Sequence, residues 1–236
     1  MGEAKNIVIL TGAGISAESG VATFRDKGGL WAQHRIEEVA TPEAFARDPG
    51  KVHGFYNMRR AGLAGVAPNA AHFALARLQR EMVKRGGAVT LVTQNVDDLH
   101  ARAGSQNILA MHGALAEALC YYCAAVTPWT EDLSVATKCP SCGSAKGMRP
   151  NVVWFGEVPH FLDEIVAAIE AADLFVAIGT SGAVYPAAGM VAEARARGVA
   201  CLELNLEPSD NAALFDDRRY GRASEIVPDW VEEVLA

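Results

Sequence analysis

The chain has 236 residues, 50% of which are hydrophobic, and a formal net charge of -7. That apolar content is enough for one large domain, alone or with a smaller module attached. The negative charge leaves no basic field that could neutralise a phosphate backbone, so the composition argues against nucleic-acid binding.

The amino-terminal segment and the lack of long apolar runs indicate a cytoplasmic protein. The first ten residues, MGEAKNIVIL, lack the basic and long apolar regions of a secretory signal. No apolar run approaches the roughly 18 residues that a transmembrane helix needs. We therefore expect a chain that makes no contact with a membrane. Because no long exposed apolar stripe stands out, we also expect a monomer.

Four short apolar runs are predicted to be buried parallel strands, because each is followed by polar residues or glycine. They are NIVILTG, AVTLVTQN, LFVAIGTS and ACLELNLE. Helical patterns separate them. Residues 70–87, for example, place Phe73, Leu75, Leu78 and Met82 at helical spacing and end in two glycines. This alternation predicts an α/β fold with a parallel sheet.

The turn after the first strand matches a dinucleotide-binding pattern. Gly12, Gly14 and Ala17 satisfy G-x-G-x-x-G/A between a predicted strand and a predicted helix. The glycines allow the backbone to approach a pyrophosphate, whose charge a helix N-terminus favours. The acidic residue that usually holds the ribose about 20 residues later is missing. Glu207 at the end of the fourth strand is the candidate to replace it, and this departure argues against an ordinary dehydrogenase.

Polar side chains follow the other predicted strands. These residues are Gln94, Asn95 and Asp97 in TQNVDD, Thr180 and Ser181 in GTSG, and Asn205 in LNLE. Ligands of open α/β sheets bind outside the carboxyl ends of the strands, where these side chains would converge. Helix capping is the alternative for Asn95, Asp97 and Ser181 taken singly. Three strands that end in this way favour a binding site.

Four of the five cysteines form two pairs. Cys120 and Cys123 are separated by fifteen residues from Cys139 and Cys142, which is the spacing of a zinc ribbon with four thiolate ligands. All four valences would go to protein, so the zinc would be structural. A redox pair or disulfides are the alternative, which a reducing compartment disfavours. Cys201 lies in an apolar run and is predicted to be buried.

Several motifs together resemble the sirtuin family in order and spacing along nearly the whole chain. They are GAGISAESGVATFRD, TQNVDD, MHG, the two CxxC pairs, VVWFGE, GTSG and LNLE. Within the family, Tyr56 and Arg59 in FYNMRR resemble the signature of the bacterial and mitochondrial class that removes acidic acyl groups from lysine. One departure is that Ala22 precedes Thr-Phe-Arg where many members carry proline, so the stiffness of that loop is in doubt.

The resemblance implies an NAD-dependent protein-lysine deacylase of the desuccinylase and deacetylase type. The acyl oxygen would displace nicotinamide, and the acyl group would pass to ADP-ribose, so NAD would be consumed. The implied architecture is a Rossmann-like large domain with a small zinc-binding module and the active site in the cleft between them. The large domain would comprise about 1–33, 69–118 and 150–236, and the small module a helical insertion at about 34–68 and the zinc ribbon at about 119–149.

The resemblance also implies roles for individual residues. His112 in AMHGAL is expected to be the general base that acts on a ribose hydroxyl, and Phe24 is expected to cover the nicotinamide side. The expected NAD-binding residues are Gly12, Ala13, Gly14, Ile15, Ala22, Phe24, Arg25, Trp31, Gln94, Asn95, Asp97, Gly179, Thr180, Ser181, Asn205, Leu206, Glu207 and Ala223. His72 and His100 sit inside helical patterns and are predicted to be structural.

The expected substrate is an acylated lysine in an extended segment of another protein. Residues 153–157 would pair with the substrate backbone as an added strand. The expected substrate-binding residues are Tyr56, Arg59, Val153, Phe155, Gly156, Glu157 and Val184.

Tyr56 and Arg59 are three residues apart and would share one face of a helix. A guanidinium binds a carboxylate through two charge-assisted hydrogen bonds, and a phenol adds one donor. A solvated arginine on an amphipathic helix is the alternative, and Arg60 is predicted to be one. A dehydrogenase, an ADP-ribosyltransferase and a non-enzymatic zinc-ribbon binding module remain competing interpretations, which nicotinamide release and product mass would separate.

Overall fold

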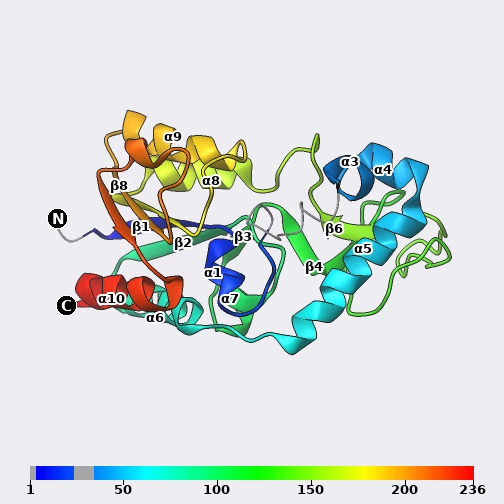
Figure 1. The fold of residues 1–236 in the computed structure, drawn as a ribbon, viewed down its shortest axis with the longest axis horizontal. Helices are drawn as coiled ribbons and strands as arrows, with labels where there is room; N and C mark the ends of the chain where they lie inside the picture. The colour runs from blue at the N-terminus through cyan, green and yellow to red at the C-terminus, as the bar shows by residue number, and fades with distance from the viewer. Residues whose placement is uncertain (1–3, 24–34) are drawn as a thin grey trace.

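The computed structural model describes residues 4–23 and 35–236, which form two sheets of different kinds (Figure 1). The larger sheet has six parallel strands in the order β3-β2-β1-β7-β8-β9. Its strands are β1 (Asn6–Thr11), β2 (Ala88–Thr93), β3 (Ile108–Ala110), β7 (Leu174–Ile178), β8 (Ala200–Asn205) and β9 (Asp217–Tyr220). The predicted Rossmann-like parallel sheet is confirmed, and the four predicted strands are β1, β2, β7 and β8.

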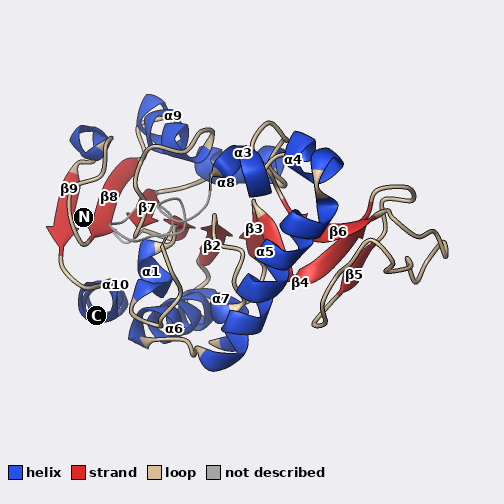
Figure 2. Cartoon of the chain, turned by 45° about the vertical axis from the view of Figure 1, so that its right-hand side comes forward, coloured by secondary structure: helices blue, strands red, loops and turns tan. Residues whose placement is uncertain are grey.

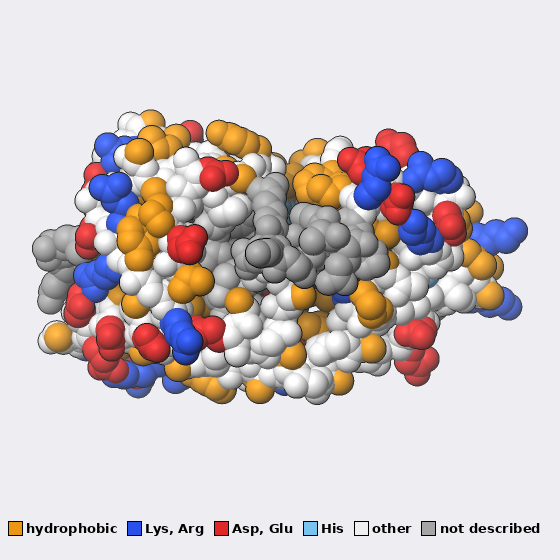
Figure 3. Space-filling model, in the orientation of Figure 1, with side chains coloured by type: hydrophobic (Ala, Val, Ile, Leu, Met, Phe, Trp, Pro, Cys, Tyr) orange, Lys and Arg blue, Asp and Glu red, His pale blue; other side chains and the backbone are white. Residues whose placement is uncertain are grey.

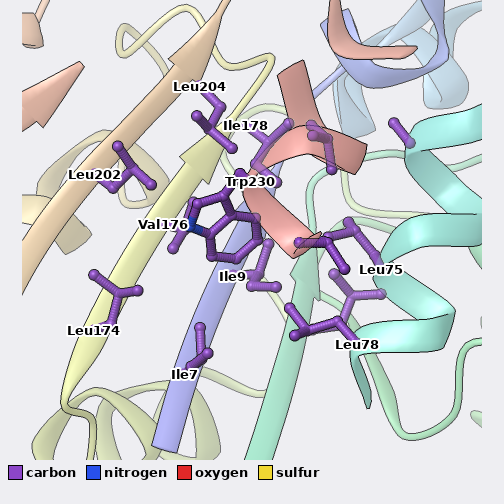
Figure 4. Close-up of a cluster of buried hydrophobic side chains, with 14 of the residues drawn as sticks. Ile7, Ile9, Leu75, Leu78, Leu174, Val176, Ile178, Leu202, Leu204 and Trp230 are labelled. Atoms are coloured by element: carbon purple, nitrogen blue, oxygen red, sulfur yellow. The ribbon is translucent and has the colours of Figure 1, made fainter. Parts of the chain in front are cut away.

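Helices cover both faces of this sheet because its central strands are apolar on both sides. In β1, Ile7 and Ile9 belong to one buried cluster and Val8 and Leu10 to another. The first cluster lies under α6 (Ala70–Lys84) and α10 (Ala223–Leu235), which supplies the fully buried Trp230 (Figure 4). The second lies under α8 (Leu162–Glu170) and α9 (Met190–Ala196).

Helix α6 follows its predicted pattern with one exception. Leu75, Leu78 and Met82 are buried in the first cluster, but Phe73 is 52% exposed and points away from it. Asn69 is the N-cap of the helix, and its side-chain oxygen accepts a hydrogen bond from the amide of Ala71 at 3.0 Å.

The second sheet is antiparallel and has the order β5-β4-β6 (Figure 2). It comprises β4 (Gly113–Cys120), β5 (Val126–Pro128) and β6 (Met148–Val152). A buried cluster joins this sheet to α3 (Ile36–Val39), α4 (Pro42–Arg47) and α5 (Pro49–Gly62). The small sheet thus extends from Gly113 to Val152, and the sequence boundaries proposed for the two modules stay a prediction.

The helices of the small module have clear start signals. Thr41 and Asp48 cap α4 and α5 by accepting hydrogen bonds from the amides of Ala44 and Lys51, and a proline opens each helix. The remaining short elements are α1 (Gly14–Ala17), α7 (Leu99–Arg102), η1 (Leu63–Gly65), η2 (Ala187–Gly189) and η3 (Ala212–Leu214). Among the described residues, no helix is both long and apolar enough to cross a membrane.

The prediction that Arg60 is solvated is wrong. Arg60 is only 7% exposed, and its Nε donates to the carbonyl of Leu115 at 2.7 Å. Its Nη1 donates to Asn57 Oδ1 at 2.9 Å and to the carbonyl of Glu131 at 3.3 Å. Asn57 also exchanges two hydrogen bonds of 2.9 Å with the backbone of Leu133. This side of α5 is therefore bound to the small sheet and to the loop that follows β5.

The strand order reverses between β1 and β7, because the chain moves outward from β1 to β3 on one side and from β7 to β9 on the other. Ligands of doubly wound sheets bind at the carboxyl ends of the strands on either side of such a reversal. The loops after β1 and β7 are therefore where a nucleotide site is expected.

Candidate active site

A cleft of about 1030 Å³ opens at the carboxyl ends of β1 and β7 and continues to α5 and the segment after β6. In the view of Figure 3 the outline of the molecule is notched between the sheet and the small module, and most charged side chains lie toward the two ends. The predicted residues that line the cleft are Gly12, Ala13, Gly14, Tyr56, Arg59, Gln94, Asn95, His112, Val153, Phe155, Gly156, Glu157, Gly179, Thr180, Ser181, Val184, Asn205, Leu206, Glu207 and Ala223.

Some predicted nucleotide-binding residues lie elsewhere. Ile15 is fully buried in the core under α10, so only its backbone could face a ligand. Ala22 and Asp97 line a smaller cavity of about 220 Å³, which shares Ala13, Arg59 and Asn95 with the cleft. Phe24, Arg25 and Trp31 lie outside the described residues.

The turn after β1 packs backbone to backbone against the turn after β7. The amide of Gly14 donates to the carbonyl of Gly179 at 2.9 Å. A Cβ at Gly12 would lie 2.7 Å from the Gly179 oxygen, and one at Gly14 would lie 2.7 Å from the Gly179 Cα. Gly179 itself has φ +61°, which side chains disfavour. All three glycines are needed for this approach, which holds the floor of the cleft together.

His112 lies directly before β4 and is oriented by a backbone carbonyl. Its Nδ1 is 3.0 Å from the carbonyl oxygen of Gln94, and because a carbonyl only accepts, Nδ1 carries the proton. Burial lowers the pKa of His112 below its ordinary value of 6.5, and the nearby His160 lowers it further, although the bond to Gln94 raises it. The ring is therefore neutral near pH 7, with Nε2 available as a base.

A buried polar network lies beneath the nucleotide turn. Asn95 Nδ2 donates to Ser16 Oγ at 3.1 Å, and Ser16 Oγ lies 3.4 Å from His72 Nε2. The His72 ring is 4.9 Å from that of His100, whose Nε2 lies 3.0 Å from Thr11 Oγ1. Both histidines are buried and hydrogen-bonded, which fits the structural role predicted for them. The network holds Asn95 against the turn.

Helix capping fits Asp97, which lies one residue before the N-cap of α7, but it does not fit Ser181, because the next helical element, η2, begins only at Ala187. Asp97 Oδ1 accepts from the amide of Leu99 at 3.1 Å at the start of α7, and Ser181 Oγ accepts from the amide of Ala183 at 3.4 Å. Asn95 instead bonds to Ser16. Burial raises the pKa of Asp97, while hydrogen bonds from Leu99 and Ser16 lower it.

The two buried histidines should make the fold sensitive to acid. Burial lowers the pKa of His72 to about 4 and that of His100 to about 3, against 6.5 when unfolded. Because only the unfolded chain takes up these protons at mildly acidic pH, stability present above pH 6.5 is lost as the pH falls. His72 alone should contribute a loss of about 3 kcal/mol by pH 4. Denaturant unfolding should show a shallower decline for His72→Gln than for wild type, and parallel declines would contradict this assignment.

Tyr56 and Arg59 line the cleft together on α5, as predicted. Tyr56 is 2% exposed, its hydroxyl accepts a hydrogen bond of 2.9 Å from Trp154 Nε1, and burial raises its pKa to about 12. The phenol is therefore neutral and keeps a proton to donate. Arg59 is partly buried, with its Cζ 5.7 Å from the centroid of the Phe55 ring. Burial lowers the pKa of Arg59, whereas Tyr56 and Asp97 raise it.

The four paired cysteines fit a tetrahedral metal site. Their sulfur atoms all lie within 4.8 Å of one another, with Cys120 Sγ 3.8 Å from Cys142 Sγ and Cys123 Sγ 3.7 Å from Cys139 Sγ. Four sulfurs at the usual Zn–S distance of about 2.3 Å from one ion would be about 3.8 Å apart. The pairs are too far apart for disulfides, and the cluster suits a structural zinc. Cys201 is buried in the core, as predicted.

Sequence reasoning missed two side chains that shape the site. Ser16 is fully buried and holds Asn95, and Trp154 is 2% exposed and bonds to Tyr56. Both stand inside motifs that pointed to the site, GAGISAESG and VVWFGE. A buried hydroxyl or indole needs a partner, but neither partner is near in sequence. Glu18, Tyr185 and Arg222 also line the cleft.

A nucleotide-type turn at the reversal of a parallel sheet, next to a four-cysteine module, defines a Rossmann-type protein with a zinc ribbon. Comparison with known proteins agrees. The Sir2 family model matches residues 12–186, and the chain belongs to the Sir2 family. It is 58% identical over 230 residues to an NAD-dependent protein deacylase of Caulobacter vibrioides, covering 98% of this chain and 97% of the relative.

Solved structures support the same assignment. A Sir2 homologue in complex with NAD has a TM-score of 0.88 and 41% identity, covering 99% of this chain and 90% of that one. A complex of Sir2 with a p53 peptide and NAD+ has a TM-score of 0.82 and 30% identity, covering 98% and 94%. The protein is an NAD-dependent protein deacylase, which sets aside the dehydrogenase and the non-enzymatic alternatives.

Proposed function

We propose that this deacylase removes acidic acyl groups such as succinyl and malonyl, as well as acetyl, from lysines in extended protein segments. The observation that carries the proposal is the pairing of Tyr56 and Arg59 on the wall of the cleft that also contains His112. A guanidinium fork and a phenol beside it offer up to three donors to a terminal carboxylate. An acetyl group has no carboxylate and would leave these donors unused, so it would be accepted more weakly.

The surroundings of this pair strengthen its attraction for an anion. Tyr56 belongs to an apolar cluster with Val52, Phe55, Val96 and Trp154, where charge interactions are screened less than in water. The positive charge of Arg59 lowers the pKa of Tyr56 against the effect of burial. The positive potential around Arg59 is local, since the chain as a whole carries a net charge of -7.

The acyl-lysine would enter between residues 153–157 and the loop that contains Val184, both of which line the cleft. The amides of Val153 and Phe155 already donate to the carbonyls of His112 and Ala40. A substrate strand on this segment would therefore donate to its carbonyls rather than accept from these two amides. Such main-chain recognition tolerates many sequences.

NAD would lie over the turn after β1, with its nicotinamide ribose near His112. The acyl oxygen would attack ribose C1′ as the bond to nicotinamide breaks, and nicotinamide would leave with the electron pair. His112 Nε2 would then take the proton of a ribose hydroxyl, whose oxygen attacks the acyl carbon. The bond between the acyl carbon and the lysine nitrogen would break to release free lysine. Water would then add to the acyl carbon, whose bond to the oxygen on C1′ would break to leave O-acyl-ADP-ribose. An ordinary reducing cytoplasm would keep the four thiolates available for zinc.

The test is Arg59→Met on matched peptides that differ only in the acyl group. Loss of charge-assisted hydrogen bonds should lower kcat/KM for succinyl-lysine by about 10- to 100-fold, with a much smaller change for acetyl-lysine. Nicotinamide release and the mass of the O-acyl-ADP-ribose product give the rates.

The matched control is Lys51→Met, which removes a positive charge from the exposed side of α5 and should change neither rate. Equal losses on succinyl and acetyl peptides in Arg59→Met would reject the acidic-acyl preference and leave the deacylase assignment standing.

A further inference from the structure

We propose that Trp154 is a positioning residue for the acyl carboxylate, because its indole N–H orients the hydroxyl of Tyr56. This inference rests on the acidic-acyl function proposed above and adds a residue whose side chain acts on the acyl group through Tyr56. The contact joins α5 to the segment after β6, which lie 98 positions apart in the chain.

The geometry assigns a direction to this hydrogen bond. An indole N–H only donates, so the Tyr56 oxygen is the acceptor at 2.9 Å. The phenol has a single proton, which prefers to lie in the plane of the ring and away from a donor. With one side of the oxygen occupied by Trp154, the proton is left for a group in the cleft. Burial of Tyr56 keeps that proton in place at neutral pH.

Trp154 is itself held on several sides. Its backbone amide donates to Glu157 Oε2 at 2.8 Å, and the Cζ of Arg149 lies 3.4 Å from the centroid of its ring. Arg149, which is 6% exposed, binds both carboxylate oxygens of Glu157 at 2.6 and 2.9 Å and the carbonyl of Val152 at 2.8 Å. The ring of Phe45 is 5.3 Å away. These contacts fix the orientation of the indole. The Tyr56 hydroxyl, which can rotate, therefore takes the orientation that the indole N–H imposes.

Packing alone does not account for the indole nitrogen. Phenylalanine would fill most of the same apolar cluster without placing an N–H group in it. Trp129 provides a comparison, because its buried Nε1 has no hydrogen-bond partner among the described residues. The hydrogen bond from Trp154 to Tyr56, which would bind the acyl carboxylate, is thus a specific feature of this site.

The experiment compares Trp154→Phe, Tyr56→Phe and the double variant on succinyl-lysine and acetyl-lysine peptides of one sequence. Trp154→Phe should lower the ratio of the two kcat/KM values by about 3- to 10-fold, through KM for the succinyl peptide rather than through kcat. In the Tyr56→Phe background the same substitution should have no further effect on that ratio. Trp129→Phe is the matched control and should leave the ratio unchanged.

Two outcomes would overturn the role of Trp154. One is an equal loss on both peptides, and the other is an undiminished effect of Trp154→Phe when Tyr56 is already phenylalanine. Arg59→Met in the same assay separates this failure from that of the proposed function. A selective loss in Arg59→Met without one in Trp154→Phe rejects only the positioning role, whereas a non-selective Arg59→Met rejects the acidic-acyl preference itself.

A second measurement covers the case in which Trp154→Phe does not fold. The chain has four tryptophans, so their indole N–H signals can be resolved by NMR in 15N-labelled protein. Tyr56→Phe removes the acceptor and should shift one indole signal and speed its exchange with solvent. Four unchanged signals would reject the hydrogen bond.

Discussion

His112→Gln should lower kcat/KM on every acyl-lysine substrate by about 100- to 10,000-fold, without preference for acidic or neutral acyl groups. Glutamine approximates the size of the ring and can still donate to the carbonyl of Gln94, but it offers no base at the position of Nε2. Because the pKa of His112 lies below 6.5 in the folded protein, the acid limb of the wild-type kcat/KM profile should fall below pH 6.5. Steady-state kinetics across pH would check both results.

His160→Gln is the control for this experiment. His160 is exposed and lowers the pKa of His112, so its removal should move the acid limb toward higher pH and leave kcat nearly unchanged. Retention of more than a tenth of wild-type activity in His112→Gln would contradict the assignment of His112 as the base.

Cys139→Ser should remove the metal and destabilise the small sheet severely. Within the part of the chain that the structure describes, the buried cluster around these cysteines consists of Ala118, Cys120, Leu133, Cys139 and Met148, so the segment has little core of its own. Structural zinc commonly contributes about 10 kcal/mol or more to the folding of such a segment. We expect less than one zinc per chain by elemental analysis and a lower midpoint of thermal unfolding.

Activity should fall with the metal, because β4 begins directly after His112 and ends at Cys120, one of the four predicted zinc ligands. Cys201→Ser is the matched control, since Cys201 is equally buried but lies in β8, away from the cluster. It should keep one zinc. A full zinc equivalent in Cys139→Ser would show that the four cysteines do not form the site.

The central sheet and the zinc cluster could be predicted from the sequence because their signals are local. Strands β1, β2, β7 and β8 are apolar runs with clear ends. The spacing of the four paired cysteines is typical of a zinc ribbon. Strand β4 could not be predicted in the same way. Its residues, GALAEALC, favour a helix by intrinsic propensity, and pairing with β5 and β6 overrides that preference. Strand β9 reads DRRY and carries no apolar run.

The residues of the candidate site also fall into two groups, those that short motifs reveal and those that depend on contacts between distant parts of the chain. Glycines, the MHG histidine and the Tyr-Arg spacing are visible in short motifs, so they could be named in advance. The burial of Arg60 and the bond from Trp154 to Tyr56 depend on partners 55 and 98 positions away. Nothing near Arg60 in the sequence shows that a carbonyl of β4 will meet its guanidinium. Such contacts appear only once the two sheets are in place.

Two sides of helix α5 make different contacts, and this bears on how related enzymes differ in their preferred acyl groups. Tyr56 and Arg59 line the cleft. Asn57 and Arg60, on the other side of the helix, are hydrogen-bonded to residues 131–133. The contacts of Asn57 and Arg60 fix the position of α5. They therefore also fix how far an acyl chain must extend into the cleft to reach Tyr56 and Arg59. Two relatives with the same pair could therefore prefer acids of different length if their 131–133 segments differ.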